Sequence, residues 1–224
     1  LIALYTGARL EEICQLLVTD IKTDGVISYF SIQLGDDEDG VTATKSLKNN
    51  ESRRSVPIHQ KLIDAGFMVY VEAMREQKQL WLFPALKADQ YNKRGGNFSK
   101  WWSRWRNSLG VGGTQRCFHA FRHTFKTACR GAGIVEDFHD ALTGHSSSSV
   151  GRNYGGFPLA ALNTELQKVS YPDLEFSWVW LPSVNKLSAW QQRQERIVER
   201  MQRKGDLNKA NLGTNRQTQH KNTP

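Results

Sequence analysis

The sequence has few cysteines and no long apolar run, and both shortages narrow the classes of protein it can belong to. Its cysteines, Cys14, Cys117 and Cys129, are too few and too scattered for a disulfide framework or a zinc site. No apolar stretch approaches the roughly 18–20 residues that a membrane-spanning helix needs, and no signal peptide is visible. We therefore expect a reduced, cytoplasmic protein that holds no metal and no membrane anchor.

Acidic residues are absent from one long segment. Residues 90–135 hold nine Lys or Arg and no Asp or Glu, and residues 185–224 hold nine basic against three acidic residues. The rest of the chain holds 12 basic and 19 acidic residues, so the formal net charge of +8 is segregated along the sequence. A solvated helix face could explain a single basic run, but localised cations over this length favour a polyanion, because neutralised phosphates release counterions. The charge pattern indicates nucleic acid as the partner.

Apolar periodicity predicts a mainly helical chain with one small sheet. Residues 1–18 carry apolar side chains at helical spacing, interrupted by "TGA". A strand is expected over 25–34, followed by the acidic turn "GDDEDG" and a returning strand over 52–58, with Pro57 at a sheet edge or at the strand's end. Further helices are expected over 61–77, 97–109, 119–132 and 134–144, with Gly144 as the C-cap of the last.

These elements predict an α+β fold in which one compact domain, residues 1–182, is followed by a tail, residues 183–224. Within the tail, residues 186–204 form a basic amphipathic helical pattern, and residues 213–224 have the composition of a disordered end. The chain opens without Met and already inside a helical pattern. We therefore expect it to be the later part of a longer protein.

Several residues are weak signals when taken singly. Arg9 could be a surface arginine paired with Glu12 one turn along, and His119 with Arg122 could be an ordinary polar helix face. The spacing of His119 and His123 suggests a metal, but "HAFRH" lacks the glutamate of a zinc-protease motif and no third ligand is evident. We expect no metal site and no cofactor.

In order and spacing, these residues resemble the tyrosine recombinase (phage integrase) family. The resemblance rests on "TGARLEEICQL", "KNNESRRSVPIH", "FHAFRHTF" and "LTGHSSSSVGRNYG", together with the non-catalytic run "LWLFPAL". It extends over roughly residues 1–175 and is closest to integrases of temperate phages and genomic islands. Family members usually carry a separate N-terminal core-binding domain, which we expect to be absent from this chain.

The resemblance implies a role for each matching residue. Arg9 and Arg122 would hold the non-bridging oxygens of the scissile phosphate, a task that suits the planar, permanently charged guanidinium. Tyr154 would be the nucleophile, His119 its general base, and His145 a hydrogen-bond donor to the phosphate. Glu12 would orient Arg9.

Two of these assignments leave an alternative open. The lysine that protonates the leaving 5′-oxygen is best matched by Lys48, with Lys45 as the runner-up. Tyr171, before Pro172, is the rival to Tyr154, but "NYGG" follows a helix as a loop, whereas "SYPDL" has the pattern of a turn.

The remaining histidines and the basic segment are assigned from their patterns. We expect His59 and His139 to be structural or on the surface, and His123 and Thr124 to support their helix. Three tryptophans at adjacent turns, Trp101, Trp102 and Trp105, are expected to be mainly core. The expected DNA-binding residues are Lys93, Arg94, Lys100, Arg104, Arg106 and Arg116.

The resemblance implies a site-specific recombinase that breaks and rejoins double-stranded DNA through a 3′-phosphotyrosyl intermediate, in the integration of a prophage or genomic island. Such an enzyme would act as a homotetramer on two duplexes, near the bacterial nucleoid, and accessory DNA-bending proteins would be compatible with it. Two alternatives are a type IB topoisomerase, which shares the catalytic residues, and a non-catalytic DNA-binding remnant of a decayed element. The complete residue set and the "TGHSSSSVGRNYG" spacing favour the recombinase.

Overall fold

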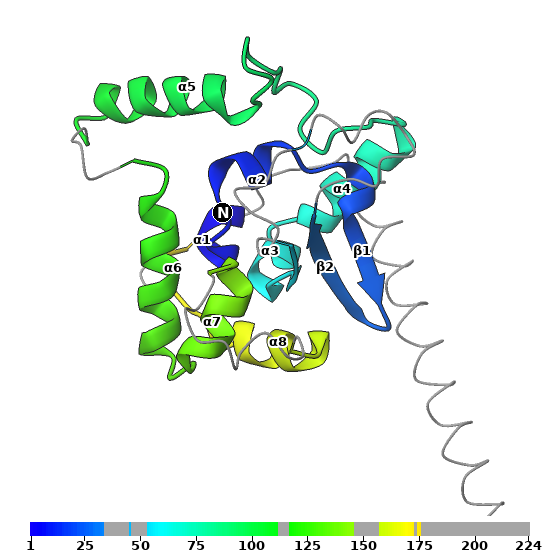
Figure 1. Ribbon diagram of the computed structural model, residues 1–224, viewed down its shortest axis with the longest axis vertical. Helices are drawn as coiled ribbons and strands as arrows, with labels where there is room; N and C mark the ends of the chain where they lie inside the picture. The colour runs from blue at the N-terminus through cyan, green and yellow to red at the C-terminus, as the bar shows by residue number, and fades with distance from the viewer. Residues whose placement is uncertain (34–44, 46–52, 112–116, 146–156, 173, 176–224) are drawn as a thin grey trace, which may run out of the picture. The chain divides into compact units, whose positions relative to one another are not determined.

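Two short helices, a 3₁₀-helix, a three-stranded sheet and six further helices are the regular elements among the described residues of a computed structural model (Figure 1). The structure describes residues 1–33, 45, 53–111, 117–145, 157–172 and 174–175. The elements are α1 (Ile2–Thr6), α2 (Leu10–Cys14), the 3₁₀-helix η1 (Val18–Asp20), β1 (Ile21–Asp24), β2 (Ile27–Ile32), β3 (Arg54–Pro57), α3 (Gln60–Asp64), α4 (Phe67–Glu76), α5 (Gly95–Ser108), α6 (Ala120–Gly131), α7 (Glu136–Thr143) and α8 (Leu159–Leu166).

The sheet is antiparallel, with strand order β1-β2-β3. Phe30 in the central strand pairs with Ile21 on one side and Val56 on the other, and all three are buried. Pro57 is the last residue of an edge strand, as expected for a residue that has no N–H to donate. The observed mixture of helices and a small antiparallel sheet confirms the predicted α+β class.

The helical core forms where α1 packs against α6, and Figure 1 shows these two helices side by side. Phe125 and Cys129 in α6 are completely buried, and Tyr5 in α1 is nearly so. Helices α7 and α8 both pack against β3, and α8 also contacts the central strand β2. This packing brings the start of α2, the strand β3 and the end of α7 together.

The structure corrects three details of the predicted elements. The single helix predicted over 61–77 is two helices, α3 and α4, because Gly66 between them adopts φ 85°. Strand β1 and helix α8 were not among the expected elements, and the β1 sequence "IKTD" is mostly polar. The predicted domain boundary at residue 182 and the tail beyond it lie outside the described residues and stay predictions.

No helix among the described residues is both long and apolar enough to cross a bilayer.

Candidate active site: an arginine cluster around Glu12

Arg9 is fixed at the start of α2 by a contact one turn along the chain. It is the N-cap residue, and its backbone N–H donates to Glu12 Oε2 at 2.8 Å. Its side chain donates from Nη1 to Glu12 Oε1, also at 2.8 Å. Glu12 is buried, whereas the Arg9 side chain is 24% exposed. The carboxylate thus caps the helix and holds the guanidinium at the surface.

Arg54 on β3 also binds the Glu12 carboxylate. Its Nη2 donates to Glu12 Oε2 at 2.8 Å, its Nη1 donates to Oε1 at 3.3 Å, and its Nε donates to the Leu142 carbonyl at 2.8 Å. Burial by itself would raise the pKa of Glu12, but the hydrogen bonds and charges of Arg54 and then Arg9 hold that pKa below its usual value. Glu12 is therefore an ionised carboxylate between two guanidinium groups.

Arg122 on α6 supplies a third guanidinium, which is almost fully buried. Its Nη1 donates to the carbonyl oxygens of Gly7 and Thr143 at 2.9 and 2.5 Å, and its Nη2 has no hydrogen-bond partner among the described residues. Burial, followed by the charges of Arg9 and Arg54, lowers the pKa of Arg122 to about 10. An anion at this point would relieve a desolvated positive charge that is short of counter-charge.

Two glycines let the backbone approach these arginines. Gly7 ends α1 at φ 60°, and a Cβ there would meet the Phe125 ring at 2.7 Å and the Thr143 methyl at 2.8 Å. Gly144 ends α7 at φ 63°, which confirms the expected C-cap, and a Cβ there would meet Arg54 Nη1 at 2.8 Å. Both positions therefore require glycine for conformation and for space.

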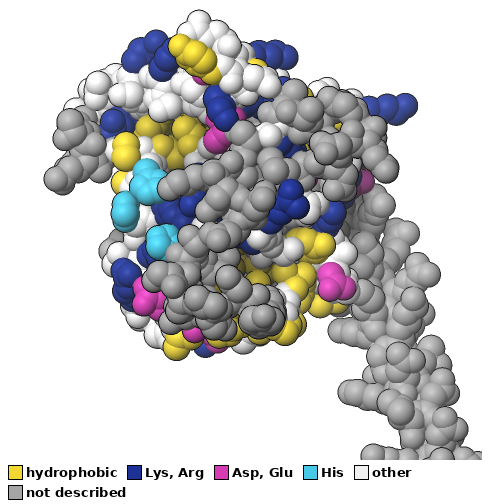
Figure 2. All heavy atoms as spheres, viewed as in Figure 1, with side chains coloured by type: hydrophobic (Ala, Val, Ile, Leu, Met, Phe, Trp, Pro, Cys, Tyr) yellow, Lys and Arg dark blue, Asp and Glu magenta, His cyan; other side chains and the backbone are white. Residues whose placement is uncertain are grey.

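His119 and His145 both lie beside the arginine cluster along the chain. His119 is exposed at the start of α6, one turn before Arg122, and its ring is 5.0 Å from that of His123. His145 follows Gly144, whose carbonyl accepts from Arg9 Nη2 at 3.4 Å, and its side chain is 59% exposed. Figure 2 shows histidine side chains next to Lys and Arg side chains on one face of the molecule. This arrangement puts two imidazole side chains, which can transfer protons, near the arginine cluster.

The Asp140 carboxylate, five residues before His145, is already paired with neighbouring side chains. Asp140 lies 2.7 Å from Lys126 Nζ and 3.2 Å from His139 Nδ1, and its backbone carbonyl accepts from the His145 N–H at 3.0 Å. Ligand atoms of Glu136, His139 and Asp140 lie within 4.8 Å of one another, but Lys126 neutralises the Asp140 carboxylate. His139 is buried, and burial lowers its pKa. The closeness of Glu136, His139 and Asp140 is therefore accounted for by the pairing of Asp140 with Lys126 and His139.

The two candidate tyrosines differ in what the structure describes. Tyr154 lies outside the described residues. The Tyr171 hydroxyl donates to the Leu4 carbonyl at 2.6 Å, and its ring packs edge-on against Tyr5. Burial first, then the neighbouring Cys129 and Tyr5, raises the pKa of Tyr171. A tyrosine held in this way is poorly suited to act as a nucleophile.

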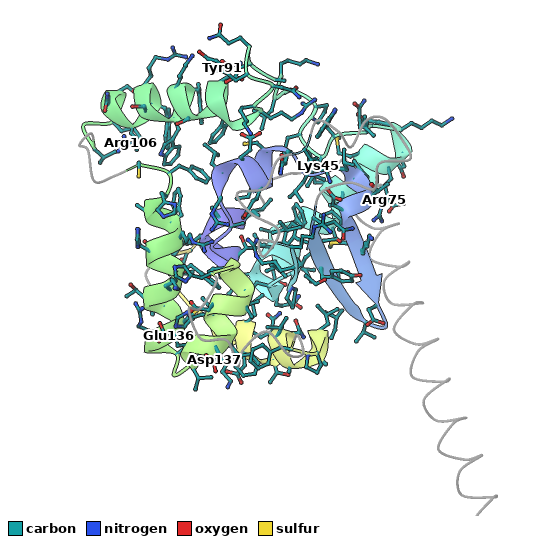
Figure 3. All side chains as sticks on the ribbon, viewed as in Figure 1. Lys45, Arg75, Tyr91, Arg106, Glu136 and Asp137 are labelled. Atoms are coloured by element: carbon teal, nitrogen blue, oxygen red, sulfur yellow. The ribbon has the colours of Figure 1, made fainter. Side chains whose placement is uncertain are left out.

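The two candidate lysines divide similarly. Lys48 lies outside the described residues. Lys45, labelled in Figure 3, is buried, with its Nζ 2.6 Å from Asp20 Oδ2. In this arrangement the Lys45 ammonium is held by a carboxylate.

The expected DNA-binding residues occupy different environments around α5. Lys93, Lys100 and Arg104 are exposed. The Arg94 guanidinium lies 3.5 Å above the centre of the Trp81 ring and donates to the Leu86 carbonyl. Arg106 is buried on α5 (Figure 3), and Arg116 lies outside the described residues. Lys93, just before α5, and Lys100 and Arg104 on α5 are therefore the residues of this set that a phosphate backbone could reach.

The expectation that the α5 tryptophans are mainly core is wrong for two of them. Trp101 and Trp105 are 47% and 42% exposed and stack on each other with centroids 5.8 Å apart. Trp102 is half-buried against Phe118 and Phe121. Helix α5 therefore presents aromatic rings together with its basic side chains.

The fold and the cluster define an α+β protein in which three arginines gather around Glu12 and the ends of α1 and α7. Comparison with protein-family models matches residues 1–155 to the Phage integrase family. The chain belongs to the phage integrase family. Among solved structures, an integrase from mycobacterium phage Brujita is similar at 16% identity and a TM-score of 0.49, over 84% of this chain and 53% of that one. The chain thus spans about half the length of that integrase. No curated protein matches it.

Proposed function

We propose that this chain carries the catalytic residues of an integrase that cuts and rejoins DNA at specific sites through a covalent bond to Tyr154. The observation that carries the proposal is the convergence of Arg9 and Arg122, from helices far apart in the sequence, next to the turn that bears His145. Arg122 is buried with a lowered pKa and an Nη2 that no described residue engages. A bound phosphodiester would supply the missing counter-charge.

The phosphate would lie between the two arginines during strand cleavage. Arg9 and Arg122 would each donate to a non-bridging oxygen, and His145 would add a third donor. Preorganised donors of this kind stabilise the charge that develops on the phosphoryl oxygens, because they are already aimed at it before the reaction begins. The carbonyls of Gly7 and Thr143 hold Arg122 so that it needs little rearrangement.

The chemistry then needs a base, a nucleophile and an acid. The Tyr154 oxygen attacks phosphorus as its proton passes to His119, and the bond from phosphorus to the 5′-oxygen breaks. Lys48, with Lys45 as the alternative, gives a proton to the leaving 5′-oxygen. The 3′-phosphotyrosyl bond conserves the energy of the phosphodiester, so a second 5′-hydroxyl can attack it without ATP.

The proposal extends to the biological setting. Recombination between two duplexes requires four cleavages, which fits a homotetramer that assembles on attachment-like DNA sites, with accessory bending proteins as further partners. Integration of a prophage or genomic island is the process in which such an enzyme would act.

A covalent adduct with DNA tests the proposal. A duplex nicked near the exchange point traps the protein, because the short 5′-hydroxyl fragment diffuses away before rejoining. The full-length protein should form an adduct that Tyr154→Phe abolishes and Tyr171→Phe retains. Tyr91 is 74% exposed, so Tyr91→Phe controls for the loss of a surface hydroxyl. Absence of any adduct across candidate attachment sites would leave a non-catalytic DNA-binding protein, and relaxation of supercoils by a monomer would favour a topoisomerase.

A further inference from the structure

We propose that Arg54 is a positioning residue of the strand-cleavage site, which fixes Glu12 and through it the place where Arg9 presents its charge to the phosphate. The inference rests on the proposed function because it concerns the same phosphate site. Arg54 was not among the residues that the sequence singled out, and its contacts lie 42 and 88 positions away along the chain.

The Arg54 side chain joins three elements at one point. From β3 it donates to the Leu142 carbonyl at the end of α7 and, with two nitrogens, to the Glu12 carboxylate on α2. The side chains of Arg54 and Glu12 are 6% and 3% exposed. A two-point guanidinium–carboxylate pair in such a buried setting allows one orientation of the carboxylate.

That orientation decides where Arg9 lies. The same two Glu12 oxygens accept from the Arg9 backbone N–H and from Arg9 Nη1, both at 2.8 Å. Arg54 leads the groups that keep Glu12 ionised against the effect of burial. Without Arg54, burial would favour the protonated acid, one oxygen would become a donor, and Arg9 would lose part of its anchor.

Arg54 also supports the turn that carries His145. Its guanidinium lies directly against Gly144, where an added Cβ would come within 2.8 Å of Nη1 and 3.2 Å of two further Arg54 atoms. The Gly144 carbonyl in turn accepts from Arg9 Nη2. One side chain therefore sets the positions of Arg9 and of the backbone just before His145.

The test measures single-turnover cleavage by the full-length protein on a nicked duplex at saturating concentration. Arg54→Met should lower the cleavage rate about 100-fold with DNA affinity unchanged, because small displacements of positioning groups are costly. Arg54→Lys, which keeps the charge but lacks the fork, should recover only part of the rate. Arg53→Met removes the neighbouring exposed arginine and should cleave at nearly the wild-type rate.

A second substrate separates positioning from folding. When the scissile phosphate is replaced by a neutral methylphosphonate, less charge remains for Arg9 to stabilise, so the loss in Arg54→Met should shrink, in parallel with that of Arg9→Ala. The positioning role would be overturned if Arg54→Met lost the same factor in cleavage rate on the phosphodiester and on the methylphosphonate. It would also be overturned if the variant cleaved the phosphodiester at the wild-type rate. Failure of the wild-type protein itself to form an adduct would instead overturn the proposed function.

Discussion

The Nη1 atom of Arg122 lies 2.9 Å from the carbonyl oxygen of Gly7, 115 positions earlier in the chain. This contact ties the turn between α1 and α2 to the helix that carries His119, and it places Arg9, two residues after Gly7, beside Arg122. The arginine cluster therefore depends on a backbone turn that only glycine fits, and this dependence can be measured.

Gly7→Ala should weaken both the fold and the site. Alanine at φ 60° costs about 1–2 kcal/mol, and the contacts of its Cβ with Phe125 and Thr143 add about 1–3 kcal/mol. Urea unfolding should show the lower stability, and the adduct assay a slower cleavage. Gly25→Ala is the matched control, because Gly25 has φ 59° with no atom within 4 Å of its Cβ position and should lose only the conformational part. Equal losses in the two variants would contradict the steric argument.

Stability should fall as the pH drops below about 6.5, the ordinary histidine pKa. Burial lowers the pKa of His59 and of His139 in the folded protein. Below pH 6.5 the unfolded chain therefore binds more protons than the folded chain, and the equilibrium shifts toward unfolding. Each histidine contributes a slope of at most about 1.4 kcal/mol per pH unit, down to its folded pKa. His59→Asn keeps a cap acceptor for the Lys61 N–H and should flatten part of the slope in urea unfolding between pH 7 and 5. An unchanged slope would exclude His59 as a source, and exposed His123→Asn is the control.

A substrate whose leaving group needs no proton should show which of the two candidate lysines is the general acid. Lys48→Met should slow cleavage about 100- to 10,000-fold, the usual contribution of a general acid. A substrate with sulfur in place of the bridging 5′-oxygen should restore the rate, since a thiolate leaves without a proton. Lys45→Met should instead lower the free energy of unfolding by about 3–5 kcal/mol, because it leaves Asp20 buried without its partner. Sulfur rescue of Lys45→Met, with no effect at Lys48, would reverse the assignment.

The exposed cations of α5 should account for part of the salt dependence of DNA binding. Lys100→Gln should reduce the slope of log K against log salt by about 0.9, the value for one phosphate contact. Lys168→Gln, two residues past the end of α8, removes another exposed lysine, which is paired with Glu165, and should leave the slope unchanged. Matching slopes for both variants would show that net charge, and not α5, governs the binding.

The parts of the site that were predictable from sequence are those encoded locally. The spacing of Arg9 and Glu12 indicates a contact one turn apart, and Gly144 stands where a helix must end, so both appear in the structure as expected. Arg54 gives no such signal, because its partners come from two other elements. Only the tertiary fold, in which β3 packs against α7, brings Arg54 within reach of Glu12.

The errors in the fold have similar causes. Residues 61–77 have a continuous helical period, yet Gly66 adopts a left-handed conformation that periodicity does not reveal. Tryptophan at helical spacing is usually core, but α5 has too few apolar neighbours among the described elements to cover Trp101 and Trp105. Hydrophobicity predicts which side chains prefer burial, whereas the available partner surface decides which of them obtain it.

Carbonyl oxygens, at Gly7, Thr143, Leu142 and Gly144, anchor all three guanidinium groups of the cluster. A peptide carbonyl is the same whatever side chain its residue carries. Substitutions at non-glycine positions along these turns can therefore leave the arginine cluster intact as long as the path of the main chain is kept. Related chains could share this site while agreeing in little more than a few arginines, one glutamate and the glycines that bend the chain around them.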